Sequence, residues 1–285
     1  MSGSKRGAVL RQSRRGFVTF FIDESIKEDH IFYMRYLFET KKVKIYGFRY
    51  PSQEKRVVGY CVRPKKNGRH PILIWNRGGT ESYGSIDAGT FANVLIPFAE
   101  QGFTVYASNL GVDDTHDISG TKDVEAMIRF LKLEKKPLFV AGHSRGCMTT
   151  WTLLARNPKL NVRAVACSAG IADYTLLKKE RPGVYDFIKH LGGDVSKKSM
   201  ERRSGIRLVS RLPKIPYLLI HGDQDRRALV HHSIDMAERL AEEGRDVTLK
   251  IRKGYDHGYN RKMKNEIQKI ARWFFAFENK GSRKD

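Results

Sequence analysis

The chain has 285 residues, 40% of them hydrophobic and 11% aromatic, and its 53 Lys and Arg against 31 Asp and Glu give a formal net charge of +22. This length suits one large or two small domains, and the hydrophobic content excludes a wholly disordered chain. No apolar run approaches the ~18–20 residues that cross a bilayer, and the basic N-terminus lacks the apolar stretch of a secretory signal. We therefore expect a cytoplasmic protein without a membrane span.

Strand-like segments recur along the chain after a flexible basic arm, which we expect over residues 1–16. Short runs of β-branched and aromatic residues with little polar alternation are typical of strands buried on both faces of a parallel sheet. The predicted strands are residues 44–50, 57–63, 71–76, 103–108, 138–142, 162–168, 217–221 and 247–252.

Helical segments alternate with these strands. The predicted helices are residues 88–100, 121–133, 148–156, 233–243 and 262–277. The alternation predicts a single three-layer α/β domain over residues 17–285, with a mostly parallel sheet of about eight strands and helices on both faces. Residues 171–212 interrupt the alternation, because they are charged and contain no predicted strand. We expect them to form a small helical cap inserted into the domain.

A Gly-x-Ser-x-Gly pentapeptide lies where a predicted strand passes into a predicted helix. In a strand–turn–helix of this kind, a sharp turn presents the serine hydroxyl above the sheet. Gly142 and Gly146 would let the strand and the helix pack closely around the strained turn. The motif and its context therefore predict Ser144 as a nucleophile.

A serine hydroxyl needs a base to take its proton, and after such a turn the acid and the histidine follow the serine in that order. Asp225 and His257 follow two consecutive predicted strands, and His257 lies in a glycine-bracketed loop. Asp223 competes with Asp225, which we favour because it lies further from the strand end. We interpret His221 as a residue that holds the acid loop in place.

A tetrahedral intermediate also needs hydrogen-bond donors for its oxyanion. One expected donor is the backbone N–H of Arg145, the residue after the nucleophile. The other should come from the loop after the predicted strand 71–76, where Arg77 and Gly78 are both candidates. Glycines in that loop would let the backbone approach the substrate closely.

These segments resemble the catalytic domain of the prolyl oligopeptidase family of serine hydrolases, over about residues 70–277. The segments that carry the resemblance are residues 76–79, Asp117 with Gly120 and Asp123-Val124, residues 142–146, residues 202–204 with 212–216, residues 218–225 and residues 256–258. The resemblance implies the α/β-hydrolase fold, with Ser144 as nucleophile, Asp225 as acid and His257 as base. It implies an acyl-enzyme intermediate and no metal or organic cofactor.

Two departures from the family bear on the substrate. Arg145 stands where the family's peptidases usually have an aromatic residue. Only about 70 residues precede the hydrolase segments, so we expect no β-propeller of the kind that restricts those peptidases to short peptides. We therefore expect a small-molecule carboxylic ester as substrate, with short peptides as the alternative. The chain also resembles stand-alone esterases and dienelactone-hydrolase-like proteins, although the latter use cysteine where this chain has Ser144.

Two groups of residues raise the question of a metal site. His231-His232 begins a predicted helix without a third ligand nearby in the sequence, so we interpret it as a surface pair. The other group is better explained as an ordinary loop than as a cation site; it consists of Asp113, Asp114, His116 and Asp117. We expect no bound metal.

The three cysteines, Cys61, Cys147 and Cys167, are an odd number placed within apolar segments. This arrangement indicates buried thiols in a reducing compartment rather than a disulfide framework. Although Cys147 lies close to the pentapeptide, it has no separate base, so we do not expect it to be catalytic.

The positive charge is concentrated away from the predicted site. Residues 1–71 have 17 basic and 6 acidic side chains, whereas residues 72–170 have 10 and 9. A nucleic-acid-binding protein combines such charge with a recognition motif, and this sequence has none that we identify. We interpret the charge as a solvated surface and expect no specific nucleic acid as partner. A non-catalytic ligand- or polyanion-binding protein of the same fold is the alternative from another class.

Overall fold

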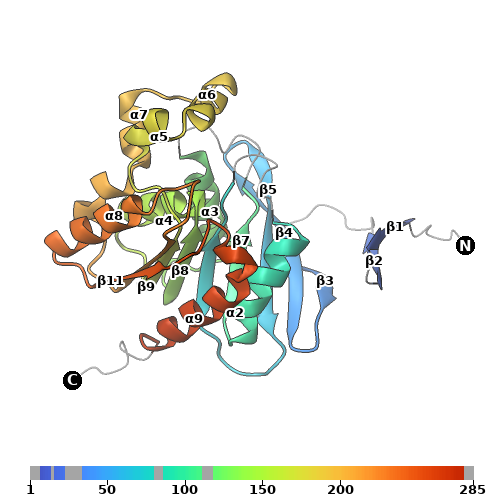
Figure 1. Cartoon of the computed structure of the whole chain (residues 1–285). Helices are drawn as coiled ribbons and strands as arrows, with labels where there is room; N and C mark the ends of the chain where they lie inside the picture. The colour runs from blue at the N-terminus through green and yellow to red at the C-terminus, as the bar shows by residue number, and fades with distance from the viewer. Residues whose placement is uncertain (1–6, 14–15, 23–33, 80–85, 111–117, 279–285) are drawn as a thin grey trace, which may run out of the picture.

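A nine-stranded sheet runs through the computed structural model of the protein (Figure 1). The structure describes residues 34–79, 86–110 and 118–278, and the backbone of residues 7–13 and 16–22. The strands of the large sheet are β3 (Arg35–Glu39), β4 (Val43–Ser52), β5 (Lys55–Pro64), β6 (Ile72–Asn76), β7 (Thr104–Ser108), β8 (Leu138–His143), β9 (Val162–Ser168), β10 (Tyr217–Gly222) and β11 (Val247–Arg252). Their order across the sheet is β11-β10-β9-β8-β6-β7-β5-β4-β3.

The sheet is mostly parallel. The pairs from β7 through β6, β8, β9 and β10 to β11 are all parallel, and the pairs that join β3, β4, β5 and β7 are antiparallel. The carboxyl ends of parallel strands meet at one edge of a sheet, where α/β folds bind their ligands. The loops that follow β8, β10 and β11 therefore converge.

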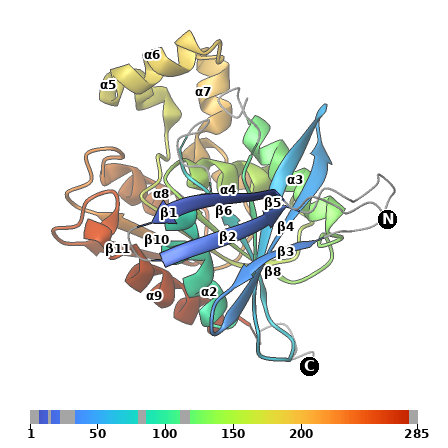
Figure 2. The same cartoon turned by 90° about the vertical axis from the view of Figure 1, so that its right-hand side faces the viewer.

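Helices cover both faces of the sheet (Figures 1 and 2). Those between the strands are α1 (Ala88–Thr90), η1 (Phe91–Leu95), α2 (Ile96–Glu100), α3 (Ser119–Phe130), α4 (Arg145–Arg156), α8 (His231–Glu242) and α9 (Met263–Phe275). Successive side chains of a strand point to opposite faces. Accordingly, Val140 of β8 packs in the core beneath α3, α4 and α8, and Phe139 packs in the core beneath α2 and α9. Burial on both faces explains the uninterrupted apolar runs.

Six short helices and no strand occupy the chain between β9 and β10. These are η2 (Tyr174–Leu176), α5 (Leu177–Glu180), α6 (Pro182–His190), α7 (Lys197–Arg203), η3 (Gly205–Arg207) and η4 (Val209–Arg211). In both views α5, α6 and α7 lie above the sheet. We call residues 171–212 the cap. Apolar side chains from four of its helices form a buried cluster with Met148 of α4, among them Tyr174 and Met200.

The structure differs from the prediction in its N-terminal part. The strand β3 was not predicted, because it is short, half-exposed and bounded by Arg35 and Glu39. The segment expected as a flexible arm contains β1 (Gly7–Ser13), which pairs with β2 (Gly16–Ile22) in a separate antiparallel sheet. No helix in the described part of the chain is both long and apolar enough to cross a membrane.

Candidate active site

Ser144 occupies a strained turn between β8 and α4. Its backbone has φ 55° and ψ −124°, a conformation that is costly for a residue other than glycine. A Cβ on Gly142 would collide with the carbonyl group of Gly146, and a Cβ on Gly146 would collide with that of Asn76. The two glycines of the pentapeptide are therefore required by close backbone packing, as the sequence predicts.

The side chains of Ser144, His257 and Asp225 form a continuous hydrogen-bonded row. The Ser144 hydroxyl donates to His257 Nε2 over 3.0 Å, and His257 Nδ1 donates to Asp225 Oδ2 over 2.7 Å. The Asp225 carboxylate is fully buried, whereas the His257 side chain is 15% exposed. The three predicted residues are thus in contact, although Ser144 and His257 lie 113 positions apart in the sequence.

The Asp225 carboxylate has three further interactions besides its contact with His257. Its Oδ1 accepts from the backbone N–H groups of Arg227 at 2.8 Å and Ala228 at 2.9 Å. Its Oδ2 lies 3.2 Å from Nε2 of His221. Burial alone would raise the pKa of Asp225, but hydrogen bonds from His221, His257 and the backbone of Ala228 outweigh it and hold that pKa well below its ordinary value. Asp225 is therefore ionised throughout the working range of pH.

His221 fixes the loop that contains Asp225. It is fully buried at the end of β10, where Nε2 donates to the carbonyl oxygen of Ala228 over 2.8 Å and Nδ1 accepts from the hydroxyl of Ser233 over 2.6 Å. The competing acid, Asp223, does not contact His257 in this structure. Its Oδ1 accepts from the backbone N–H of Gly254 at 2.6 Å, and thus braces the loop after β11.

The loop that carries His257 is held by its neighbours. Asp256 Oδ1 accepts from the backbone N–H of Asn260 at 2.7 Å, and Asn260 Oδ1 accepts from the backbone N–H of Asp256 at 3.0 Å. Tyr259, Asn260 and Arg261 all have positive φ angles, between 50° and 63°. Three successive left-handed residues form a tight turn, and the side-chain bonds of Asn260 close it.

His143 is a neighbour of His257 that the sequence did not single out. Its ring lies 5.1 Å from that of His257 and its Nδ1 is 3.0 Å from the hydroxyl oxygen of Ser168. Burial, followed by the charge of His257, lowers the pKa of His143 to about 3. A neutral imidazole therefore packs against the ring of His257. His143 occupies a variable position of the pentapeptide, so the motif does not predict its contact with His257.

Gly78 lies beside Ser144. A Cβ built on Gly78 would be 3.0 Å from Cβ and 3.7 Å from Oγ of Ser144. Arg77 is buried and its side chain points elsewhere: Nε donates to the carbonyl oxygen of Asn109 and Nη1 to that of Gly78 itself. The guanidinium therefore holds the loop, and the backbone near Gly78 approaches Ser144. Arg145 is the first residue of α4, where backbone N–H groups lie outside the helix's own hydrogen-bond ladder.

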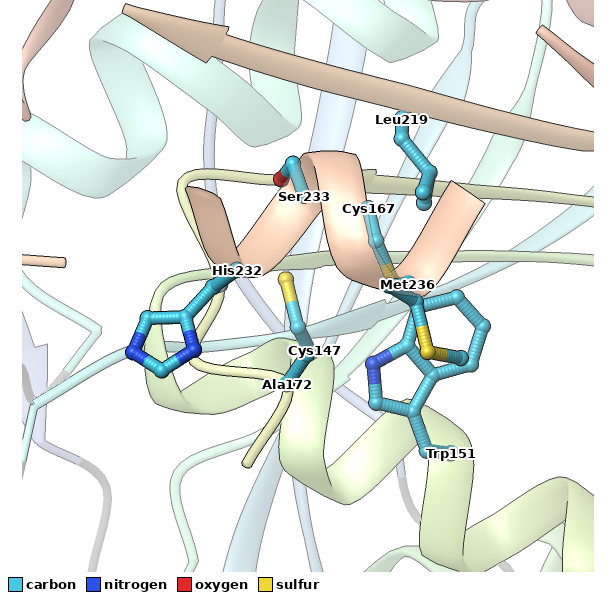
Figure 3. Close-up of a pocket in the computed structure, with 9 residues that line it drawn as sticks. Cys147, Trp151, Cys167, Ala172, Leu219, His232, Ser233 and Met236 are labelled. Carbon is cyan, nitrogen blue, oxygen red and sulfur yellow. The ribbon is translucent and has the colours of Figure 1, made fainter. Parts of the chain in front are cut away.

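The predicted buried thiols are confirmed. All three cysteines are free and buried, and burial raises the pKa of Cys61 to about 12 and that of Cys167 well above its ordinary value. The Cys147 thiol donates to the carbonyl oxygen of Ser168 at 3.3 Å. Figure 3 shows Cys147 and Cys167 in a small pocket next to Met236 and the ring of His232.

The interpretation of His231-His232 as a surface pair without a third ligand is wrong. Glu180, at the end of α5 in the cap, accepts hydrogen bonds from both imidazoles. These three residues could hold a metal ion. Sequence spacing gave no indication of this, because Glu180 is 51 positions away. The other candidate cluster, with Asp113, Asp114, His116 and Asp117, lies outside the described residues.

Similarity to known proteins identifies the family of this chain. The sequence profile of the prolyl oligopeptidase family matches residues 98–280, which is more than half of the chain. The chain belongs to the prolyl oligopeptidase family. It is also 26% identical, over 247 residues, to a Bacillus subtilis protein named as the uncharacterized peptidase YtmA, covering 82% of this chain and 94% of that protein.

Solved structures show the same fold. The acylaminoacyl peptidase of Pyrococcus horikoshii matches with a TM-score of 0.69 and 18% identity, over 96% of this chain and 48% of that one. The chain thus spans about half the length of that peptidase. An esterase of Pyrobaculum calidifontis matches with a TM-score of 0.67 and 17% identity, over 82% and 86% of the two chains. The α/β-hydrolase fold is confirmed, and family membership identifies the chain as a serine hydrolase.

Proposed function

We propose that this member of the family hydrolyses small carboxylic esters through an acyl-enzyme, with Ser144, His257 and Asp225 as its catalytic triad. The observation that carries the proposal is the row of two hydrogen bonds from Ser144 Oγ to His257 Nε2 and from His257 Nδ1 to Asp225 Oδ2. A serine is activated by a base that is itself oriented by a third group.

Each residue has a distinct role in this mechanism. His257 Nε2 takes the proton of Ser144 Oγ as that oxygen attacks the ester carbonyl, and it then protonates the leaving alkoxide. Ionised Asp225 keeps the imidazole in the required tautomer and stabilises its positive form. Water then attacks the acyl-enzyme with His257 again as base, which releases the acid and restores Ser144.

The oxyanion that forms in each half-reaction needs donors in place before the reaction begins. We assign this role to the backbone N–H of Arg145 and to the backbone at Gly78, which approaches Ser144. Arg77 acts as a positioning residue, because its guanidinium binds the carbonyl oxygen of Gly78 and that of Asn109 at the end of β7. The near-neutral charge of this segment of the chain suits an uncharged ester.

Hydrolysis of short peptides is the second candidate, favoured by the similarity to a protein named as a peptidase. Both reactions use the same three residues and differ in the leaving group. A panel of nitrophenyl esters of graded acyl length beside short aminoacyl amides distinguishes them. We expect kcat/KM for the best ester to exceed that for the best amide by orders of magnitude; comparable values would favour the peptidase.

A fluorophosphonate probe tests the triad itself. The folded protein should be labelled on Ser144, and Ser144→Ala should abolish both labelling and ester hydrolysis. Ser210→Ala changes an exposed serine of η4 and is the matched control. Failure to label the folded wild-type protein would favour the non-catalytic alternative. Ester hydrolysis that is undiminished in Ser144→Ala would contradict the assignment of the nucleophile.

A further inference from the structure

Glu180, His231 and His232 form a compact ligand cluster between the cap and α8. His231 Nε2 lies 2.9 Å from Glu180 Oε1, and His232 Nε2 lies 2.8 Å from Glu180 Oε2. One ligand atom from each residue lies within 4.8 Å of the others. A tetrahedral zinc ion with bonds of about 2.0–2.2 Å places its ligand atoms about 3.3–3.5 Å apart. Small side-chain movements therefore suffice to bring the three atoms onto one ion.

A hydrogen bond from its second ring nitrogen orients His231 as a metal ligand requires. His231 Nδ1 donates to Asp235 Oδ2 at 3.0 Å, one turn further along α8, which leaves Nε2 directed at Glu180. A carboxylate on the far nitrogen is the usual support of a metal-bound histidine, because it fixes the tautomer and makes the ligand more basic.

His232 is the buried member of the cluster. It is only 2% exposed, and its Nδ1 has no hydrogen-bond partner within the described structure. The ring of His232 lines the pocket of Figure 3. A buried polar atom left in this way needs a compensating gain at the site. Coordination through Nε2, with the ring proton moved from Nε2 to Nδ1, would provide one.

We propose that Glu180, His231 and His232 bind one transition-metal ion of the zinc type and thereby join the cap to α8. Two imidazoles and one carboxylate are borderline ligands that suit Zn²⁺, Ni²⁺ or Cu²⁺, whereas Ca²⁺ and Mg²⁺ prefer oxygen ligands throughout. Three protein ligands leave a fourth position for water. The ion replaces the hydrogen bonds between each imidazole and Glu180: the Nε2 proton of His231 is released to water, that of His232 moves to Nδ1, and no oxidation or reduction is involved.

The site would connect the cap to the loop of the proposed acid. Ser233, directly after His232, donates to His221, and His221 in turn contacts Asp225. Arg181, directly after Glu180, donates to the backbone carbonyl of Arg227 in the same loop. An ion at Glu180 would therefore restrain the cap against the part of the core that holds Asp225.

Zinc chloride alone tests the proposal in the full-length, metal-free protein. Calorimetry should show one strongly bound Zn²⁺ per chain, and both Glu180→Gln and His231→Gln should weaken this binding about tenfold or more. His190→Gln, which changes an exposed histidine elsewhere in the cap, should leave it unchanged. His231 is 36% exposed on its side chain, so its replacement tests the ligand without emptying the core.

Two further measurements separate this site from others. His116→Gln should leave the binding unchanged; loss of zinc binding in this variant alone would overturn the proposal, as would equal affinity in all variants. Limited proteolysis should show that Zn²⁺ slows cleavage within the cap several-fold in the wild type but not in His231→Gln. If Zn²⁺ binds the wild type stoichiometrically but does not slow cleavage of its cap, the proposal that the ion links the cap to α8 would be overturned.

Discussion

The imidazole rings of His143 and His257 pack against each other, with centroids 5.1 Å apart and planes inclined by 48°. His143 is held neutral, because burial and the charge of His257 lower its pKa to about 3. The proposed base therefore becomes positive, during the reaction, beside a ring that does not repel it. This contact makes the residue before the nucleophile a determinant of activity.

A positive charge at position 143 should impair catalysis. At about 5 Å and an effective dielectric constant of about 20, two like charges repel by roughly 3 kcal/mol, and solvent screening reduces this. We expect His143→Lys to lower kcat about 10–100-fold. His143→Gln keeps a polar side chain without charge and should lower kcat only a few-fold. Equal kcat values for the two variants, measured on the same ester, would show that charge at this position is unimportant.

A methyl group on Gly78 should displace the proposed oxyanion loop. Its Cβ would lie 2.9 Å from the carbonyl oxygen of His143 and 3.0 Å from Cβ of Ser144, so the backbone must move. Loss of one oxyanion donor costs about 10²–10³ in kcat, and we expect Gly78→Ala to fall in this range with a smaller change in KM. Gly183→Ala, where nothing lies within 4 Å, is the control. A fully active Gly78→Ala enzyme would exclude this loop from the oxyanion site.

Asp225 should make stability depend on pH. Its folded-state pKa lies below the unfolded value of about 4, so the ionised carboxylate stabilises the fold above that pH. This contribution is lost as the pH falls from about 4 toward the folded-state pKa. The free energy of unfolding in urea should therefore differ more between the wild type and Asp225→Asn at pH 7 than at pH 3.

The control for this measurement is Asp186→Asn, which removes one exposed negative charge of α6 from the same basic chain. A gap for Asp225→Asn that does not change with pH, or that widens at pH 3, would mean that the buried carboxylate is not the source of the pH dependence.

Asn260 should matter for the position of His257. Its side chain closes the turn through Asp256, and its own φ is 50°, a conformation that alanine adopts at a cost of about 1–2 kcal/mol. We expect Asn260→Ala to lower kcat about 5–30-fold, the equivalent of a similar loss of positioning energy. Asn260→Gly removes the same bonds without the backbone cost and should be less impaired. Asn260→Ala should also lower the melting temperature by a few degrees because of this backbone strain, and Asn260→Gly should lower it less. Unchanged kcat in both variants would contradict the role of the turn.

The parts of the fold that follow from hydrophobic patterning were predicted well. The strands β6, β8 and β10 are apolar runs, because they are buried on both faces of the parallel part of the sheet. The half-exposed β3 lacks this signature and was not predicted. The cap helices are short and packed mainly on one another and on α4, so their positions depend on contacts that no local pattern encodes.

The site could be predicted only where a motif fixes the geometry. Ser144 lies in a turn that requires glycines at both sides, and Asp225 and His257 follow strands whose ends must meet. His143 and Glu180 have no such signal. His143 is identified only by its contact with the ring of His257. Glu180 precedes His231 and His232, which it contacts, by 51 and 52 residues. Contacts of this kind depend on tertiary packing, which one sequence does not specify.

The position of β11 at the edge of the sheet has a consequence for the chain during its synthesis. A nascent chain that has folded only as far as β10 and the loop after it would contain the proposed nucleophile and acid but not the proposed base, because His257 follows β11. Reactivity toward esters would thus begin only when the last strand docks. The rate at which activity returns after dilution from urea would therefore report the completion of the sheet rather than the collapse of its core.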